Sequence, residues 1–209
     1  KVSIPFEVYG FGDARKGEST DKVTSNRYKD GDVVLNDSFY LRKFISSELR
    51  ASDYRKALEY LFFMKHFWSG DSGYYGSSQM MLNEKHYYIS LPRADNLGST
   101  PLNDAIIVGM ELLDAFRKKT GVAICNAVFL TDGESNGLSG VYNAAHGQSE
   151  HITRKACRNG AEVILHDDKS RKVMKVDRYG SAGTTTAFLL DAMRNRCGVR
   201  ASGFFILPS

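Results

Sequence analysis

The chain has few cysteines and no paired cysteine motif. Cys125, Cys157 and Cys197 are the three cysteines among its 209 residues, and they lie far apart in the sequence. An odd number of cysteines without a CxxC pair argues against a disulfide framework and against a zinc knuckle. We therefore expect the protein to work in a reducing cytoplasm.

Several other signals are missing. No apolar run is long enough to span a bilayer, so no membrane partner is expected. Neither GxxxxGKS nor GxxxxGKT occurs, so the chain has no nucleotide-binding loop of that type. The sequence starts without a Met or a secretory signal, directly in a strand-like run, which suggests a chain cut upstream of its first ordered element. The net charge of +4 permits an acidic partner without requiring one, and we do not expect nucleic-acid binding.

What the chain does contain is typical of one globular domain. With 42% hydrophobic and 25% charged residues it has enough apolar material for a sizeable core. Apolar periodicity predicts strands at residues 4–11, 123–131 and 200–207. It predicts helices at residues 39–68, with a break near Arg50, and at 99–120 and 185–196. A β-hairpin is expected over residues 162–177 and an exposed loop over residues 12–37.

The order of these elements indicates a fold class. Strands that alternate with helices predict the α/β class, with a doubly wound, mostly parallel sheet and helices on both faces. Pro101 suits the first turn of the helix at 99–120, and Gly121 suits its end. We expect a single domain over residues 1–209.

Two short segments carry the chemistry. Residues 98–106 read GSTPLNDAI, a small-residue loop that opens a helix, and residues 128–137 read VFLTDGESNG, a strand followed by an acidic, glycine-rich turn. In an open α/β sheet such loops meet at the carboxyl ends of the strands, where ligands bind. The Thr100 hydroxyl and the Asp132 carboxylate are oxygen ligands of the kind that Mg²⁺ prefers. The pair therefore predicts a divalent-metal site.

These segments also follow the order of a known family. With FEVYGFGD at residues 6–13 and GVRASGFFI at residues 198–206, the chain resembles a von Willebrand factor A (vWA) domain over most of residues 4–207. It looks most like the intracellular branch, which includes domains of cobalt and magnesium chelatase subunits, and like cobaltochelatase-like relatives in tailed bacteriophages. The resemblance implies Mg²⁺ or Mn²⁺ held by Thr100 and by Asp132, directly or through water. It also implies the cytoplasm of a bacterium or of an infected host cell.

One family motif is absent. The first metal-binding loop of the family, D-x-S-x-S, does not occur in this chain. In the family that loop, with its strand and helix, precedes the strand expected at residues 4–11. The chain therefore lacks roughly one βα unit of about 30 residues. That unit is either missing from this sequence or supplied by another chain.

The resemblance implies a protein-binding module rather than an enzyme with its own active site. The ion would take a carboxylate from a protein partner, and the expected partner is a MoxR-type or chelatase-type AAA+ ATPase. Two alternatives stay open. One is an accessory subunit of a cobalt or magnesium chelatase, and the other is a structural phage protein with a degenerate metal site.

Simpler interpretations exist for the same residues. Asp132 precedes a glycine, and Asp-Gly is a common turn dipeptide. Thr100 and Ser99 suit a helix cap. Ser99, Asp13 and Glu134 are secondary candidates for the metal site: Ser99 is expected to be only a cap, Glu134 a solvated turn residue, and Asp13 a residue on the rim after the first strand.

Three further patterns suggest other chemistry. GDSG at residues 70–73 with His146 resembles protease motifs, but the order is reversed and no all-β pattern accompanies it. His146 and His151 lack a third zinc ligand at a helpful spacing. The basic residues of the hairpin are expected to form a solvated face rather than a phosphate site; they are Lys169, Arg171, Lys172, Lys175 and Arg178.

Overall fold

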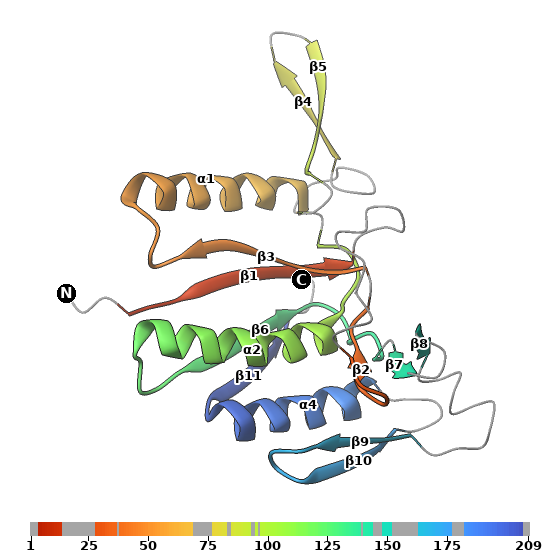
Figure 1. Ribbon diagram of the computed structural model, residues 1–209. Helices are drawn as coiled ribbons and strands as arrows, with labels where there is room; N and C mark the ends of the chain where they lie inside the picture. The colour runs from red at the N-terminus through yellow and green to blue at the C-terminus, as the bar shows by residue number, and fades with distance from the viewer. Residues whose placement is uncertain are drawn as a thin grey trace. The chain divides into compact units, whose positions relative to one another are not determined.

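The computed structural model describes residues 4–13, 28–36, 38–68, 77–82, 85–92, 95, 97–138, 140–143, 148–151, 163–176 and 182–206. They form a mixed α/β structure with three helices in the described part and several small sheets (Figure 1). The chain divides into two compact units. The first comprises Lys1–Ala14 and Tyr40–Gly98, and the second comprises Arg15–Phe39 and Ser99–Ser209.

The first unit contains a two-stranded sheet, a helix and a hairpin. Strand β1 (Glu7–Asp13) pairs with β3 (Phe39–Ser46), whose first residue is assigned to the second unit. The strands run in opposite directions (Figure 1), because Ser47 after β3 donates its amide to Phe6 before β1. Helix α1 (Ala51–Trp68) follows, and strands β4 (Ser77–Leu82) and β5 (Lys85–Ser90) form an antiparallel hairpin.

A small core and one buried charge hold this unit together. Met64 of α1 packs with Leu91, and partly buried residues surround the pair. The carboxylate of Asp95 is fully buried, pairs with Arg42 and accepts a hydrogen bond from Tyr60. Burial, followed by the hydrogen bond and charge of Asp95, raises the pKa of Tyr60 to about 12. Because every partner of Asp95 is part of the fold, we interpret this cluster as structural.

The second unit contains the parallel strands. Strand β6 (Asn126–Thr131) pairs in parallel with β11 (Arg200–Phe205), in a register that matches Phe129 with Gly203 and Thr131 with Phe205. Helices α2 (Leu102–Thr120) and α4 (Ala182–Cys197) pack against each other beside this strand pair (Figure 1). A Cβ on Gly109 would stand 3.1 Å from Met193 Cε, so the glycine in α2 allows α4 to approach closely.

Antiparallel elements complete the second unit. Strands β9 (Val163–Asp167) and β10 (Lys172–Val176) form a hairpin, and β2 (Val33–Val34), β7 (Gly140–Asn143) and β8 (Gln148–His151) form a three-stranded sheet. Cys197 ends α4 and Thr120 ends α2. The glycines that follow, Gly121 (φ 68°) and Gly198 (φ 60°), adopt the left-handed conformation that terminates helices.

The sequence predictions are confirmed for several elements and wrong for others. The helices expected at 99–120 and 185–196, the hairpin over 162–177 and the strands at 4–11, 123–131 and 200–207 are present, with shifted bounds. Residues 39–46 were expected to be helical but form β3, because this aromatic-rich segment pairs with β1. The loop expected over 12–37 contains β2 and the end of β1, and its residues 14–27 and 37 lie outside the described residues.

The parallel sheet is smaller than expected. Among the described residues only β6 and β11 pair in parallel, whereas the other pairs with a determined register are antiparallel. Strand β6 exposes one face: Val128 and Leu130 are each 58% exposed, because α2 and α4 pack on the opposite face. A complete doubly wound sheet with helices on both faces therefore stays a prediction, as does the single domain over residues 1–209. None of the described helices is both long and apolar enough to cross a membrane.

Candidate functional site

The loop that opens α2 contacts the loop that follows β6. A Cβ on Gly133 would stand 2.8 Å from the Thr100 hydroxyl oxygen, so Gly133 lies directly against Thr100. Asn136 donates its backbone amide to the Thr100 carbonyl over 2.8 Å. The two segments with the strongest sequence signal are thus adjacent within the second unit.

A second hydrogen bond joins the same loops at the surface. The side-chain amide of Asn136 donates to Ser99 Oγ over 2.7 Å. Ser99 itself has a φ of 65°, a left-handed conformation that is uncommon for a residue other than glycine. Such strain persists only where surrounding contacts hold it, and here Asn136 and the Thr100 backbone supply them. Asn136 is exposed, and its side chain joins the two loops.

The helix cap is formed by a different residue from those expected. Pro101 occupies the N-cap position of α2 and makes no side-chain cap bond, so the prediction that Ser99 or Thr100 caps the helix is wrong. The hydroxyl of Ser135, 32 residues away, accepts the amide of Asn103 over 3.0 Å. It also donates to the Asn136 carbonyl. The loop after β6 therefore satisfies a first-turn amide that a local cap would otherwise bind.

Asn103 links the loop to α4. Its side chain is fully buried, donates to the Asn136 carbonyl over 2.9 Å and accepts from Thr186 of α4 over 2.7 Å. On the next residue, the buried Asp104 accepts the amide of Asn36 over 2.9 Å. These buried polar groups fix the start of α2 against three other segments.

Two oxygen ligands remain available beside this network. Within the part of the chain that the structure describes, neither the Asp132 carboxylate nor the Thr100 hydroxyl is used in a hydrogen bond or ion pair. Asp132 is exposed directly after β6, and Thr100 is half-buried. Ser99 Oγ, by contrast, already accepts from Asn136. The arrangement offers one carboxylate and one hydroxyl to a hard cation.

The secondary candidates occupy different positions. Glu134 is exposed, and its carboxylate points toward the start of α4, where a Cβ on Gly183 would stand 4.0 Å from it. Asp13 ends β1 in the first unit, where its amide donates to the Gly98 carbonyl. Among the described residues no group of three or more His, Cys, Asp or Glu side chains could hold a metal ion. A site built on a hydroxyl, one carboxylate and water does not require such a group.

The other chemical patterns find no support as sites. GDSG at residues 70–73 and His146 lie outside the described residues, as does the side chain of His151. His166 pairs with Asp168 at the exposed hairpin turn. Lys172 pairs with Asp191 and Lys169 donates to the Arg196 carbonyl, so two of the described basic residues of the hairpin bind α4.

Comparisons with models of protein families, with curated proteins and with solved structures found no match to this chain. The resemblance to vWA domains therefore stays a prediction from the motifs.

Sequence reasoning missed Ser135 and Asn103. Both are polar residues that the structure buries: Ser135 lies inside an acidic turn, and Asn103 follows Leu102 at the start of an amphipathic helix. A partial signal exists, because an Asn in the first turn of a helix needs a partner if it is buried. The partners of Asn103 lie 32 or more residues away, so local sequence does not identify them.

Proposed function

We propose that this chain is a metal-ion-dependent protein-binding module built on a vWA-type doubly wound sheet. The observation that carries the proposal is the adjacency of Thr100 and the 132–136 loop, in which Gly133 lies against the Thr100 hydroxyl and Asn136 binds the Thr100 carbonyl. Mg²⁺ or Mn²⁺ is the proposed ion. Thr100 and Asp132 are its proposed protein ligands.

The donor set fits a weakly held, partly hydrated ion. Mg²⁺ prefers six oxygen ligands and usually keeps several waters, with one or two carboxylates from the protein. Thr100 supplies a neutral oxygen and Asp132 a single negative charge, so a bound dication would retain positive charge. When bound, the ion would act as a Lewis acid that accepts a carboxylate from a partner protein.

The residues around Thr100 and Asp132 hold the two proposed ligands in place. Asn136 fixes the Thr100 backbone, and Ser135 fixes the first turn of α2. Gly133 leaves space for the Thr100 hydroxyl, because any side chain there would collide with it. Preorganised ligands lose little freedom on binding, which favours affinity. The proposed partner is a MoxR-type or chelatase-type AAA+ ATPase, for which this domain would position a client.

Calorimetric titration with Mg²⁺ and Mn²⁺ tests the proposal. We expect saturable binding to the wild-type chain. Asp132→Asn keeps the shape of the side chain and removes the charge, and Thr100→Val removes only the hydroxyl. Each is expected to weaken binding by about tenfold or more, which corresponds to about 1.4 kcal/mol.

Asp114→Asn is the matched control, because Asp114 is an exposed carboxylate on α2 away from the loop. It should bind the ions as the wild type does. Circular dichroism establishes that each variant is folded. Absence of binding by the folded wild type, or equal binding by Asp132→Asn and Thr100→Val, would overturn the proposed metal site.

A further inference from the structure

The loop after β6 contains an asparagine directly before a glycine, and both residues, Asn136 and Gly137, are exposed. In such a pair the backbone nitrogen of the glycine can attack the side-chain carbonyl carbon of the asparagine, because the glycine has no Cβ to shield its nitrogen. A Cβ on Gly137 would meet no heavy atom within 4 Å, so neighbouring side chains do not cover this peptide unit either. Both reaction partners are therefore accessible.

The attacking nitrogen is also free of hydrogen bonds. Across the part of the chain that the structure describes, the Gly137 amide donates to no acceptor. The second side chain before a glycine in this loop, Asp132, differs in this respect, because the Gly133 amide donates to Thr131 Oγ1 over 3.2 Å. A nitrogen held as a donor must give up that bond before it can attack. The geometry therefore favours reaction at Asn136 over reaction at Asp132.

Two donors activate the peptide unit that joins Asn136 to Gly137. The Asn136 carbonyl accepts from Ser135 Oγ and from Asn103 Nδ2, each over 2.9 Å. When the Gly137 nitrogen loses its proton, negative charge develops on this carbonyl oxygen. Donors already aimed at that oxygen stabilise the charge, so they make the nitrogen easier to deprotonate and the attack faster.

A surface hydrogen bond opposes the reaction only weakly. Asn136 Nδ2 donates to Ser99 Oγ over 2.7 Å at an exposed position, and this bond must break before the side chain can turn toward Gly137. Water replaces an exposed hydrogen bond of this kind, so the net cost of breaking it is small.

We propose that Asn136 is a site of spontaneous deamidation. The Gly137 nitrogen gives its proton to a solvent base and forms a bond to Asn136 Cγ. The bond from Cγ to Nδ2 breaks, and the nitrogen leaves as ammonia after it takes a proton from water. Water then opens the resulting succinimide ring at either carbonyl, which leaves aspartate or isoaspartate at this position. The overall reaction consumes one water and releases one ammonia, without any oxidant or reductant.

The reaction changes the loop in two ways. It removes the Nδ2 donor that holds Ser99 in its left-handed conformation, and it adds a carboxylate to the loop that contains Asp132. On the proposed function, a second carboxylate near the ion raises its affinity, because affinity for hard cations increases with the charge of the ligand set. Deamidation would then act as an irreversible regulator of the metal site.

Peptide mass spectrometry of the full chain, sampled over time in warm, mildly alkaline buffer, tests the deamidation. We expect Asn136 to convert at least about tenfold faster than the fully buried Asn103. Gly137→Ala adds a Cβ that shields the nitrogen, and it should slow the conversion of Asn136 by about tenfold or more. Absence of conversion in the wild type, or conversion at an equal rate in Gly137→Ala, would overturn the proposal.

Calorimetry with Asn136→Asp tests the consequence for the ion separately. This variant carries the carboxylate from the start, and it should bind Mg²⁺ about tenfold or more tightly than the wild type does. Asn126→Asp is the matched control, because Asn126 is exposed at the opposite end of β6 from Asp132, and it should bind as the wild type does. If the wild type binds Mg²⁺ and Asn136→Asp binds it no more tightly, the regulatory role is wrong. If the wild type binds no Mg²⁺, the proposed function fails, whereas the mass spectra still decide whether Asn136 deamidates.

Discussion

At the scale of single residues, Gly133 has the most demanding position in the candidate site. It follows Asp132 and faces the Thr100 hydroxyl, and its backbone amide and carbonyl both bond Thr131 Oγ1. Its φ is not in the left-handed region, so the requirement for glycine here comes from space rather than from backbone conformation.

Gly133→Ala is therefore expected to destabilise the chain by about 1–3 kcal/mol, because a side chain placed 2.8 Å from Thr100 Oγ1 forces the two loops apart. Urea denaturation measures the free energy of unfolding. If the metal site exists, the same variant should also bind Mg²⁺ more weakly.

Gly137→Ala is the control for this substitution. Gly137 lies in the same loop, has no positive φ, and a Cβ there would meet nothing within 4 Å. Alanine should be neutral at this position or stabilising by up to about 1 kcal/mol. Equal stability of the two variants would show that Gly133 and Thr100 are not in contact.

At the scale of elements, the β9–β10 hairpin is attached to α4 by charged groups. Asp167 is 2% exposed and pairs with Arg196 of α4, and Lys172 pairs with Asp191 over 3.1 Å. Burial alone would raise the pKa of Asp167. The hydrogen bonds from Ser170 and Arg196, with the Arg196 charge, outweigh burial and lower it below its usual value.

Because the pKa of Asp167 is lowered, the free energy of unfolding of the chain depends on pH. The contribution of Asp167 is complete above the unfolded-state pKa of about 3.9, and it is lost as the pH falls through the lower folded-state pKa. Asp167→Asn should destabilise the chain by about 2 kcal/mol at neutral pH, and its stability should fall less on acidification than that of the wild type. Thermal unfolding between neutral and acidic pH measures both effects.

Asp168→Asn is the control, because the Asp168 side chain is 91% exposed at the same turn. It should follow the wild-type pH profile of melting temperature closely. A wild-type profile that matches Asp167→Asn at every pH would contradict the role of the Asp167–Arg196 pair.

At the scale of the whole molecule, the reactivity of two buried cysteine thiols measures how well the chain is folded. Cys125 and Cys197 are 7% and 3% exposed, and burial raises the pKa of both thiols. Cys197 also donates to the Met110 carbonyl over 3.5 Å. The thiolate is the reactive form, so both residues are protected by access and by protonation.

We expect iodoacetamide to modify Cys125 and Cys197 in the native chain at least about tenfold more slowly than a cysteine in a short peptide. In denaturing urea the rates should become equal. Peptide mass spectrometry assigns the modified residue. Rapid modification of Cys197 without denaturant would mean that the packing of α4 against α2 does not bury this thiol as the structure describes.

The sequence by itself determined the elements whose signals are local. The apolar stripe of α2, its glycine stop and the alternation in the β9–β10 hairpin depend on neighbours a few residues away, and the structure confirms them. Residues 39–46 were misread because strand and helix patterns overlap in short apolar runs, and pairing with β1 decides between them. The Thr100 and Asp132 motif also predicted which two loops lie together.

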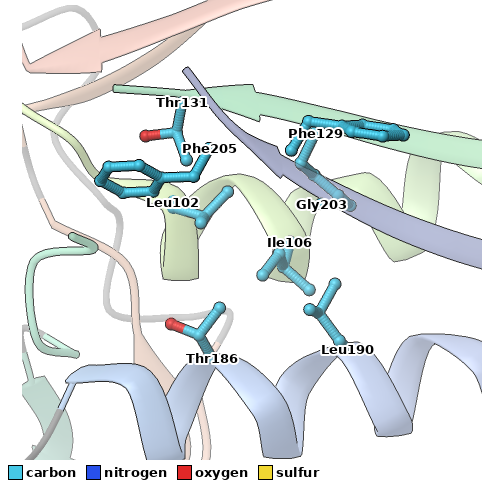
Figure 2. Close-up of a pocket in the computed structure, with 9 residues that line it drawn as sticks. Leu102, Ile106, Phe129, Thr131, Thr186, Leu190, Gly203 and Phe205 are labelled. Atoms are coloured by element: carbon cyan, nitrogen blue, oxygen red, sulfur yellow. The ribbon is translucent and has the colours of Figure 1, made fainter. Parts of the chain in front are cut away.

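Only the tertiary structure decided the features that join distant segments. Ser135 caps α2 from 32 residues away, and Thr186 bonds Asn103 across 83 residues. The open apolar pocket between β6, β11, α2 and α4 (Figure 2) depends on the strand register and on two helices at once. The physical reason is the same in each case. A buried polar group or an unfilled space depends on partners that pack against it, and local sequence does not specify which distant segment that will be.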